Sequence, residues 1–167
     1  MTEKVDTGRR HFLTVATGAT GAVGAAFAAV PFLASWKPSA RAKALGAPVE
    51  VDVSKLEPGS MVKVEWRGKA IFIVHRTQEM LASLNGVADR LRDPDSNSSE
   101  QPEYARNEAR SIKPDVLVLV GVCTHLGCAP LDKFSQGDVT VEAGWPGGFF
   151  CPCHGSKFDM SGRVFKD

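Results

Sequence analysis

The chain has 167 residues, a length that suits one globular domain of ordinary size with a short extension. Its 20 Lys and Arg residues nearly balance its 19 Asp and Glu residues, so the charge gives no reason to expect nucleic acid as a partner. The first part of the chain, up to about residue 40, is rich in Ala, Gly and Thr, whereas the remainder alternates as in a β protein.

The N-terminal segment has the features of an export signal followed by a membrane span. Residues 1–11 contain the pair Arg9-Arg10, and a weakly hydrophobic run follows, as in twin-arginine export signals. Residues 12–34 are uncharged and would form a helix of about 34 Å, enough to cross a hydrocarbon core of about 30 Å. Positive charge before this span predicts a single-pass anchor in the inner membrane, with the C-terminal domain on the periplasmic side. A plain signal anchor, whose arginines only mark the inner face, is the alternative.

Residues 35–47 connect this span to the rest of the chain. Trp36 stands where an aromatic residue at the membrane interface is expected. The many small residues and Gly46 predict a flexible tether or hinge, and a passive linker is the simpler alternative.

From residue 48 to residue 167 the pattern predicts a β domain. Short alternating or apolar runs separated by Gly and Pro turns are typical of an antiparallel β-sandwich. We expect strands at residues 49–53, 61–66, 70–75 and 115–122. We expect a polar loop at 91–113 with a short helix near 103–110, and a small hairpin strand at 137–143 to which we assign no chemistry. His75, at the end of an apolar strand, is expected to be structural.

The four cysteines all lie between residues 123 and 153, interleaved with histidines in two boxes. The boxes read Cys123-Thr124-His125-Leu126-Gly127-Cys128 and Cys151-Pro152-Cys153-His154-Gly155-Ser156. This clustering indicates a metal site, because a disulfide framework would spread its cysteines along the chain. Gly127 and Gly155 can adopt positive φ angles and turn backbone N–H groups towards a buried anion such as a 2Fe–2S cluster.

Two other interpretations of the boxes stay open on the residues alone. A structural zinc site would use four of the six groups, although the Cys-x-His spacing is tighter than zinc sites usually have. Two structural disulfides would leave the matched histidines without a role.

Both boxes resemble those of Rieske proteins, specifically the iron–sulfur subunits of bacterial ubiquinol–cytochrome c reductases, which are cytochrome bc-type complexes. The resemblance implies one 2Fe–2S cluster, with Cys123 and Cys151 on the inner iron and His125 and His154 on the outer iron. It also implies that His154 is the catalytic residue, which accepts a proton from the quinol.

The resemblance extends to the residues around the ligands. It implies a disulfide between Cys128 and Cys153, a hydrogen bond from Ser156 to a bridging sulfur, and docking through the apolar side chain of Leu126. Many family members have a tyrosine where this chain has Phe158, so a donor to the cluster is missing and a lower potential is expected. The chain also stops where the family continues into a proline-rich loop and closing strands, so we expect a fragment.

The function implied by the resemblance is one-electron transfer, coupled to a proton, from ubiquinol to a c-type cytochrome in a respiratory complex. The implied partners are cytochrome b, a c-type cytochrome, ubiquinol and membrane lipid, in a dimeric complex. Two alternatives remain at this stage. One is the Rieske small subunit of an arsenite oxidase, and the more distant one is a zinc-stabilised binding module.

Overall fold

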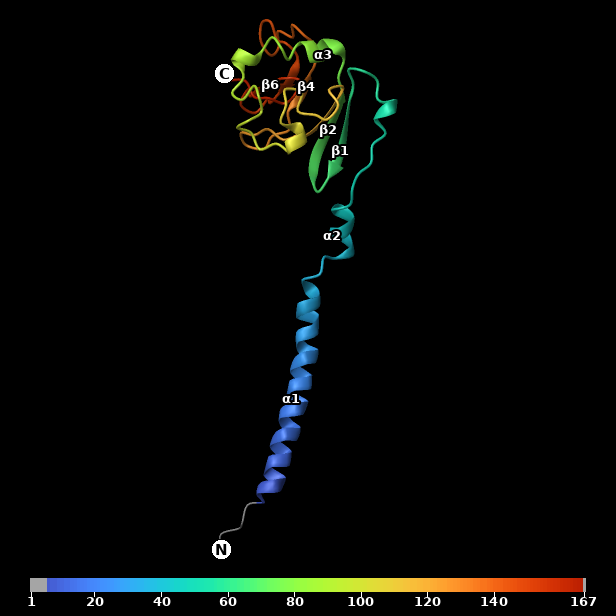
Figure 1. Cartoon of the computed structure of the whole chain (residues 1–167), viewed down its shortest axis with the longest axis vertical. Helices are drawn as coiled ribbons and strands as arrows, with labels where there is room; N and C mark the ends of the chain where they lie inside the picture. The colour runs from blue at the N-terminus through green and yellow to red at the C-terminus, as the bar shows by residue number, and fades with distance from the viewer. Residues whose placement is uncertain (1–5, 167) are drawn as a thin grey trace. The chain divides into compact units, whose positions relative to one another are not determined.

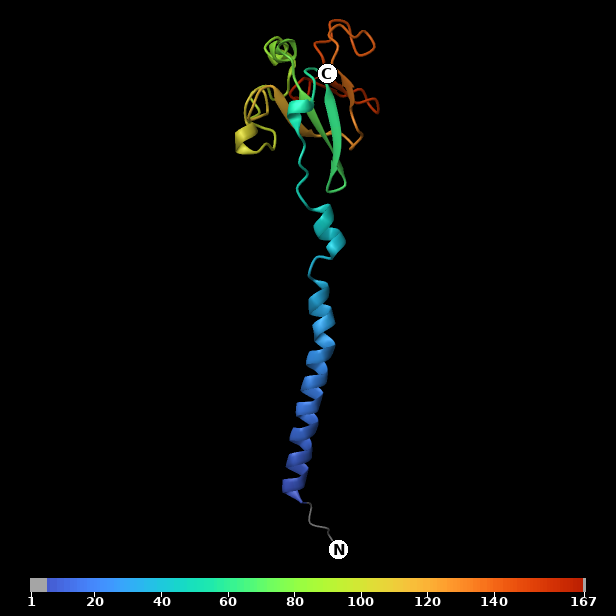
Figure 2. The same cartoon turned by 90° about the vertical axis from the view of Figure 1, so that its right-hand side faces the viewer.

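The computed structural model describes residues 6–166, which fall into two compact units (Figure 1 and Figure 2). The first unit ends at Ala47 and the second begins at Pro48. Residues 1–5 of the predicted signal region and Asp167 lie outside the described residues.

The first unit is dominated by one long helix, α1 (Thr7–Ser35). It begins at Asp6, whose carboxylate accepts hydrogen bonds from the amides of Gly8 and Arg9, a common way to satisfy the free N–H groups of a first turn. None of its side chains is buried within the part of the chain that the structure describes. Its length and apolar composition suit a membrane span, so the helix predicted at residues 12–34 is present.

A second, short helix, α2 (Ala40–Leu45), lies within the segment predicted as a flexible tether. Ser39 caps it by accepting a hydrogen bond from the amide of Ala42. We predicted a flexible tether without helix here. A helix forms because the Ala, Arg, Lys and Leu residues of this segment all favour helix.

The second unit contains two three-stranded antiparallel sheets. The first has the order β1 (Met61–Trp66), β2 (Lys69–His75) and β3 (Val116–Val120). The second has the order β4 (Leu131–Lys133), β5 (Gly148–Phe150) and β6 (Lys157–Phe158). The predicted mainly β, antiparallel architecture is confirmed, and the three predicted strands of the first sheet are present.

The strand predicted at 115–122 ends earlier than expected, at Val120. A Cβ atom at Gly121 would overlap the ring of Phe72, so the chain passes this ring only because residue 121 is glycine. The backbone then turns, with the amide of Val122 bonded to the carbonyl of Val120, and runs into the first cysteine box.

Two predicted strands are wrong. Residues 49–53 do not pair with another strand in the described chain, and Asp52 instead caps the 3₁₀ turn η1 (Val53–Lys55) by accepting from the amide of Ser54. Residues 137–143 form turns, because the Asp138 carboxylate accepts from both the amide and the hydroxyl of Thr140.

The helix predicted near 103–110 is reduced to the 3₁₀ turn η3 (Glu103–Ala105). Arg110 has a φ of +47°, which no right-handed helix allows. The elements that we did not predict include α3 (Gln78–Ala82) and the 3₁₀ turn η2 (Ala88–Arg90). His75 is hydrogen-bonded through Nδ1 to the carbonyl of Leu56 at 2.6 Å, which fits the predicted structural role.

Both sheets contribute to one buried core. Its side chains come from strands β2, β3, β5 and β6 and from the chain beside them: Phe72, Val74, Leu84, Leu117, Phe149, Phe158 and Met160. The Phe149 ring lies 6.1 Å from the ring of Phe72 and 5.4 Å from that of Phe134. Cys123 and Cys151 belong to the same buried cluster, so the packing of the two sheets fixes where these two thiols lie.

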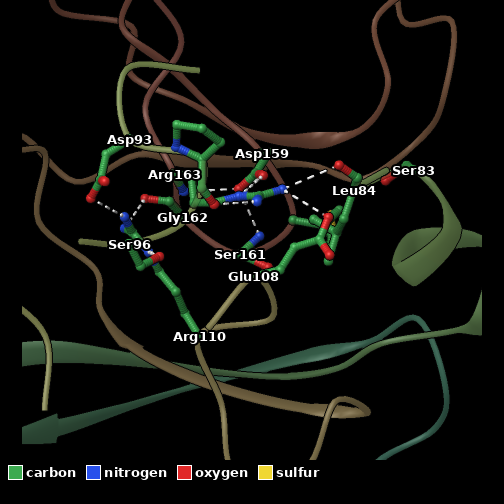
Figure 3. A network of polar contacts seen from close by, with 12 residues as sticks. Ser83, Leu84, Asp93, Ser96, Glu108, Arg110, Asp159, Ser161, Gly162 and Arg163 are labelled. Atoms are coloured by element: carbon green, nitrogen blue, oxygen red, sulfur yellow. Dashed lines mark hydrogen bonds and ion pairs between the residues drawn. The ribbon is translucent and has the colours of Figure 1, made fainter. Parts of the chain in front are cut away.

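Buried arginines hold the long polar loop against the C-terminal segment (Figure 3). Arg163 is 1% exposed, and its Nε donates to the Asp159 carboxylate at 2.7 Å. Its other nitrogens donate to the carbonyls of Pro94 and Leu84, at 2.8 and 3.2 Å. The buried guanidinium therefore has both a counter-charge and carbonyl partners, the condition under which a buried charge is tolerated.

Arg110 makes a second set of contacts in the same network. Its Nε donates to Ser96 Oγ at 2.8 Å, and its Nη1 donates to the carbonyl of Gly162 at 3.1 Å. Burial lowers the pKa of Arg110, although the negative charges of Asp159 and Asp93 oppose this effect. The loop at 91–113 is thus ordered by polar contacts, although its sequence resembles that of a loose surface loop.

We expect Asp159→Ala to lower the free energy of unfolding of the full chain by about 3–5 kcal/mol, because it leaves the buried Arg163 charge without its partner. Glu108→Ala is the matched control, since Glu108 lies 3.9 Å from the same arginine but is half-exposed. That control should cost no more than about 1 kcal/mol. Urea denaturation measures both, and equal losses would contradict the role assigned to the buried pair.

Candidate metal centre

The first cysteine box forms a loop closed by two backbone hydrogen bonds. The amide of Cys123 donates to the carbonyl of Cys128 at 2.7 Å, and the amide of Gly127 donates to the carbonyl of Cys123 at 3.0 Å. Gly127 has a φ of +81°, a conformation that glycine adopts at little cost. The box follows directly from β3, so its first cysteine is anchored in the core.

The second box forms a loop of the same design. The amide of Cys151 donates to the carbonyl of Ser156 at 2.8 Å, and the amide of Gly155 donates to the carbonyl of Cys151 at 3.0 Å. Gly155 has a φ of +77°. In both loops the first cysteine bonds to the fifth residue after it, and the glycine is the fourth, so the two boxes repeat one structure.

A disulfide between Cys128 and Cys153 joins the two loops. The sulfurs of these two residues and of Cys151 all lie within 4.8 Å of one another, but a disulfide sulfur is not a thiolate ligand. The free thiols are Cys123 and Cys151, and both are buried. The structure therefore contains the disulfide that the resemblance implies and leaves two cysteines available for metal.

The two histidines lie together on the surface of the domain. His125 and His154 are both exposed, and their ring centroids are 4.7 Å apart in an edge-to-face arrangement. Leu126, between the first loop's histidine and glycine, is 69% exposed. The site therefore has a buried half that offers sulfur and an exposed half that offers nitrogen.

Hydrogen-bond donors converge on the sulfur of Cys123. Burial raises the pKa of this thiol, but the amide of His125, the Cys151 thiol, the Ser156 hydroxyl and the amide of Leu126 together lower it below its usual value. A site that favours the thiolate form also favours metal binding, because the thiolate is the form of cysteine that binds metal. Two buried thiols, two adjacent imidazoles and these donors fit a 2Fe–2S group bound by two cysteines and two histidines.

Two further features of the site involve residues beyond the boxes. Phe158 is buried in the same core cluster as Cys123 and Cys151. Glu142 forms ion pairs with Lys157, which follows the second box, and with Arg90. The sequence analysis missed these ion pairs, because opposite charges 15 and 52 residues apart give no local signal.

Comparison with known proteins places these features in a family. Residues 97–167 match the family model described as Rieske [2Fe-2S] domain. Residues 1–39 match the model described as Ubiquitinol-cytochrome C reductase Fe-S subunit TAT signal. The second match agrees with the twin-arginine signal predicted from the sequence, and the first decides against a zinc-stabilised module.

Curated relatives agree over almost the whole chain. The ubiquinol-cytochrome c reductase iron-sulfur subunit of Allochromatium vinosum is 54% identical over 163 residues, which is 98% of this chain and 79% of the relative. The subunit of the same name from Blastochloris viridis is 44% identical, over 99% of this chain and 83% of the relative. A chain of a solved structure titled Hyperthermophilic respiratory Complex III has 30% identity and a TM-score of 0.49, over 92% of this chain and 84% of that chain.

These relatives are not arsenite oxidase subunits, so that alternative is set aside. With its two loops, its free buried thiols and this degree of identity, the chain belongs to the family of ubiquinol–cytochrome c reductase iron–sulfur subunits and has a Rieske 2Fe–2S domain.

Proposed function

We propose that this chain takes one electron and one proton from ubiquinol and passes the electron to a c-type cytochrome, as a subunit of a respiratory complex with cytochrome b. The observation that carries the proposal is the division of the site into a buried sulfur half and an exposed imidazole half. The name of its relatives, ubiquinol-cytochrome c reductase iron-sulfur subunit, supports the same reaction.

In this proposal, Cys123 and Cys151 would bind one iron of the cluster through sulfur, and His125 and His154 would bind the other through nitrogen. The bound 2Fe–2S cluster supplies a one-electron acceptor. The backbone amides of the first loop and the Ser156 hydroxyl stabilise negative charge on the buried side, where they already converge on the Cys123 sulfur.

We assign the proton to His154. Its imidazole is exposed, so a ring nitrogen can meet a quinol hydroxyl at the protein surface. A site made only of buried thiolates has no such group. The exposed Leu126 offers an apolar contact beside the histidines, which suits docking against the quinol pocket of cytochrome b.

We further propose that α1 stays in the inner membrane as a single-pass anchor, with the second unit on the periplasmic side and the whole complex dimeric. The arginines before the span favour an inside N-terminus. Trp36, which is 84% exposed, is placed to contact lipid at the interface where α1 ends.

The tether at residues 35–47 is proposed to let the domain move between its electron donor and its electron acceptor. Helix α2 has only six residues and buries none of them, so it is too short to be stable by itself in water. Melting it would lengthen the tether, because an extended residue spans about 3.3 Å and a helical residue about 1.5 Å.

Electron paramagnetic resonance on membranes that contain the chain tests the proposed function. After mild reduction with ascorbate, we expect a rhombic signal with an average g below 2, and inhibitors of the quinone site should shift it. The same signal without inhibitor sensitivity would contradict electron transfer from quinol. An iron-free chain would contradict the ligand assignment as well.

We expect Phe158→Tyr to raise the midpoint potential, because a hydroxyl in the cluster of side chains around Cys123 and Cys151 can donate to sulfur. One such hydrogen bond contributes about 1 kcal/mol, or about 40 mV for one electron. Phe165→Tyr is the control, since Phe165 is also buried but packs against Trp145 in a cluster without cysteine. Redox titration measures both, and an unchanged Phe158→Tyr potential would refute the prediction.

Stiffening the tether should slow electron delivery to the cytochrome several-fold and leave the cluster spectrum unchanged. The variant Gly46→Pro with Ala47→Pro, directly before Pro48, would make an extended and rigid segment. Gly46→Ala with Ala47→Ser is the flexible control. Flash-induced cytochrome reduction gives the rate, and equal rates in the two variants would count against a moving domain.

A further inference from the structure

The insert between the two cysteine boxes carries a carboxylate that bridges two cations. Glu142 Oε1 accepts from Arg90 Nη2 at 2.5 Å, and its Oε2 accepts from Lys157 Nζ at 2.6 Å. The Glu142 and Lys157 side chains are only 18% and 16% exposed. Burial raises the pKa of Glu142, but the hydrogen bonds and positive charges of Lys157 and Arg90 outweigh this effect. The net pKa lies below the usual value for glutamate, so the group is a carboxylate at neutral pH.

The insert is held in place firmly enough to fix this carboxylate. Trp145 is 1% exposed, and its Nε1 donates to the carbonyl of Lys133 at 2.7 Å. Its ring lies 5.8 Å from that of Phe165, and the Arg90 guanidinium lies 4.9 Å from the same Phe165 ring. The insert, the η2 region and the C-terminal segment therefore pack together around Trp145 and Phe165, and Glu142 joins the insert to η2 through Arg90.

Lys157 connects this junction to the second ligand loop. It follows Ser156, whose carbonyl closes the loop and whose hydroxyl is one of the donors that lower the pKa of Cys123. Lys157 also pairs with Phe150 across β5 and β6, so the pair Phe150 and Lys157 brackets the loop from Cys151 to Ser156. A charge that acts on Lys157 acts at the base of that loop.

We propose that Glu142 is a positioning residue for the second ligand loop, and that its charge balance with Lys157 sets the reduction potential of the site. This inference rests on the proposed ligand set. Reduction adds one negative charge to the cluster and its ligands, so nearby positive charge favours the reduced state and nearby negative charge opposes it. Glu142 offsets the positive charge of Lys157 at the loop base.

A charge cycle separates this role from simple structural support. Glu142→Gln removes a negative charge and should raise the equilibrium constant for reduction by about threefold or more. Lys157→Gln removes a positive charge and should lower it by a similar factor. The double variant Glu142→Gln with Lys157→Gln restores the local balance and should return the constant to within about twofold of the parent chain.

Redox titration of the full chain in membranes, followed by its paramagnetic signal, measures all of these constants. Glu65→Gln, an exposed carboxylate on β1, controls for the loss of one charge anywhere on the domain and should leave the constant unchanged. If Glu142→Gln loses its iron, Glu142→Asp keeps the charge on a shorter side chain and should retain the parent potential.

The inference is overturned if Glu142→Gln leaves the constant unchanged, or if the two single variants shift it in the same direction. A parent chain without the histidine-ligated signal would instead defeat the proposed function. If the parent chain gives the signal but the potential does not change in the Glu142 and Lys157 variants, only this inference is contradicted.

Discussion

The amide of Cys123 bonds to the carbonyl of Cys128, and the amide of Cys151 bonds to the carbonyl of Ser156 in the same way. These two closures, with a glycine at positive φ in each loop, turn the histidines outward and the free thiols inward. The disulfide between Cys128 and Cys153 then joins the two loops. Every feature of the proposed chemistry depends on this arrangement, because it separates the electron-accepting interior from the proton-accepting surface.

The rest of the domain supports these loops from two sides. The aromatic core between the sheets fixes the thiols, since Cys123 and Cys151 are part of it. Buried Arg163 and Arg110 bind the polar loop to the segment after the second box, so the chain near Asp159 cannot move independently of the core. Loops bury little apolar area. A small domain that binds a metal group in polar loops therefore needs buried hydrogen bonds and ion pairs of this kind to hold those loops in place.

The sequence predicted the two loops of the candidate site and their disulfide more completely than the fold, whereas the ligand assignment stays a prediction. The two boxes are short, local motifs. Closely spaced Cys, His and Gly residues indicate a metal-binding loop in any fold. The first sheet was also predictable, since its strands alternate or are wholly apolar. The short strands β4, β5 and β6 were missed because strands of two or three residues have no periodicity, and only long-range pairing defines them.

The errors arose where side chains compete with the backbone. Asp52 and Asp138 hydrogen-bond to nearby amides and so replace the expected strands with a 3₁₀ turn and tight turns. The positive φ of Arg110 excluded the expected helix, and it places the guanidinium in the buried network. The Glu142 bridge was invisible because its partners are distant in the sequence and near only in the fold.

The most direct test of the account is pulsed paramagnetic resonance on the reduced chain with ¹⁵N-labelled histidine. We predict couplings to two histidine nitrogens. Wherever iron is retained, His125→Ala should lose one coupling and His154→Ala the other. A reduced cluster with no histidine coupling in the parent chain would contradict the assignment of His125 and His154 as ligands, and with it the proposed route of the proton.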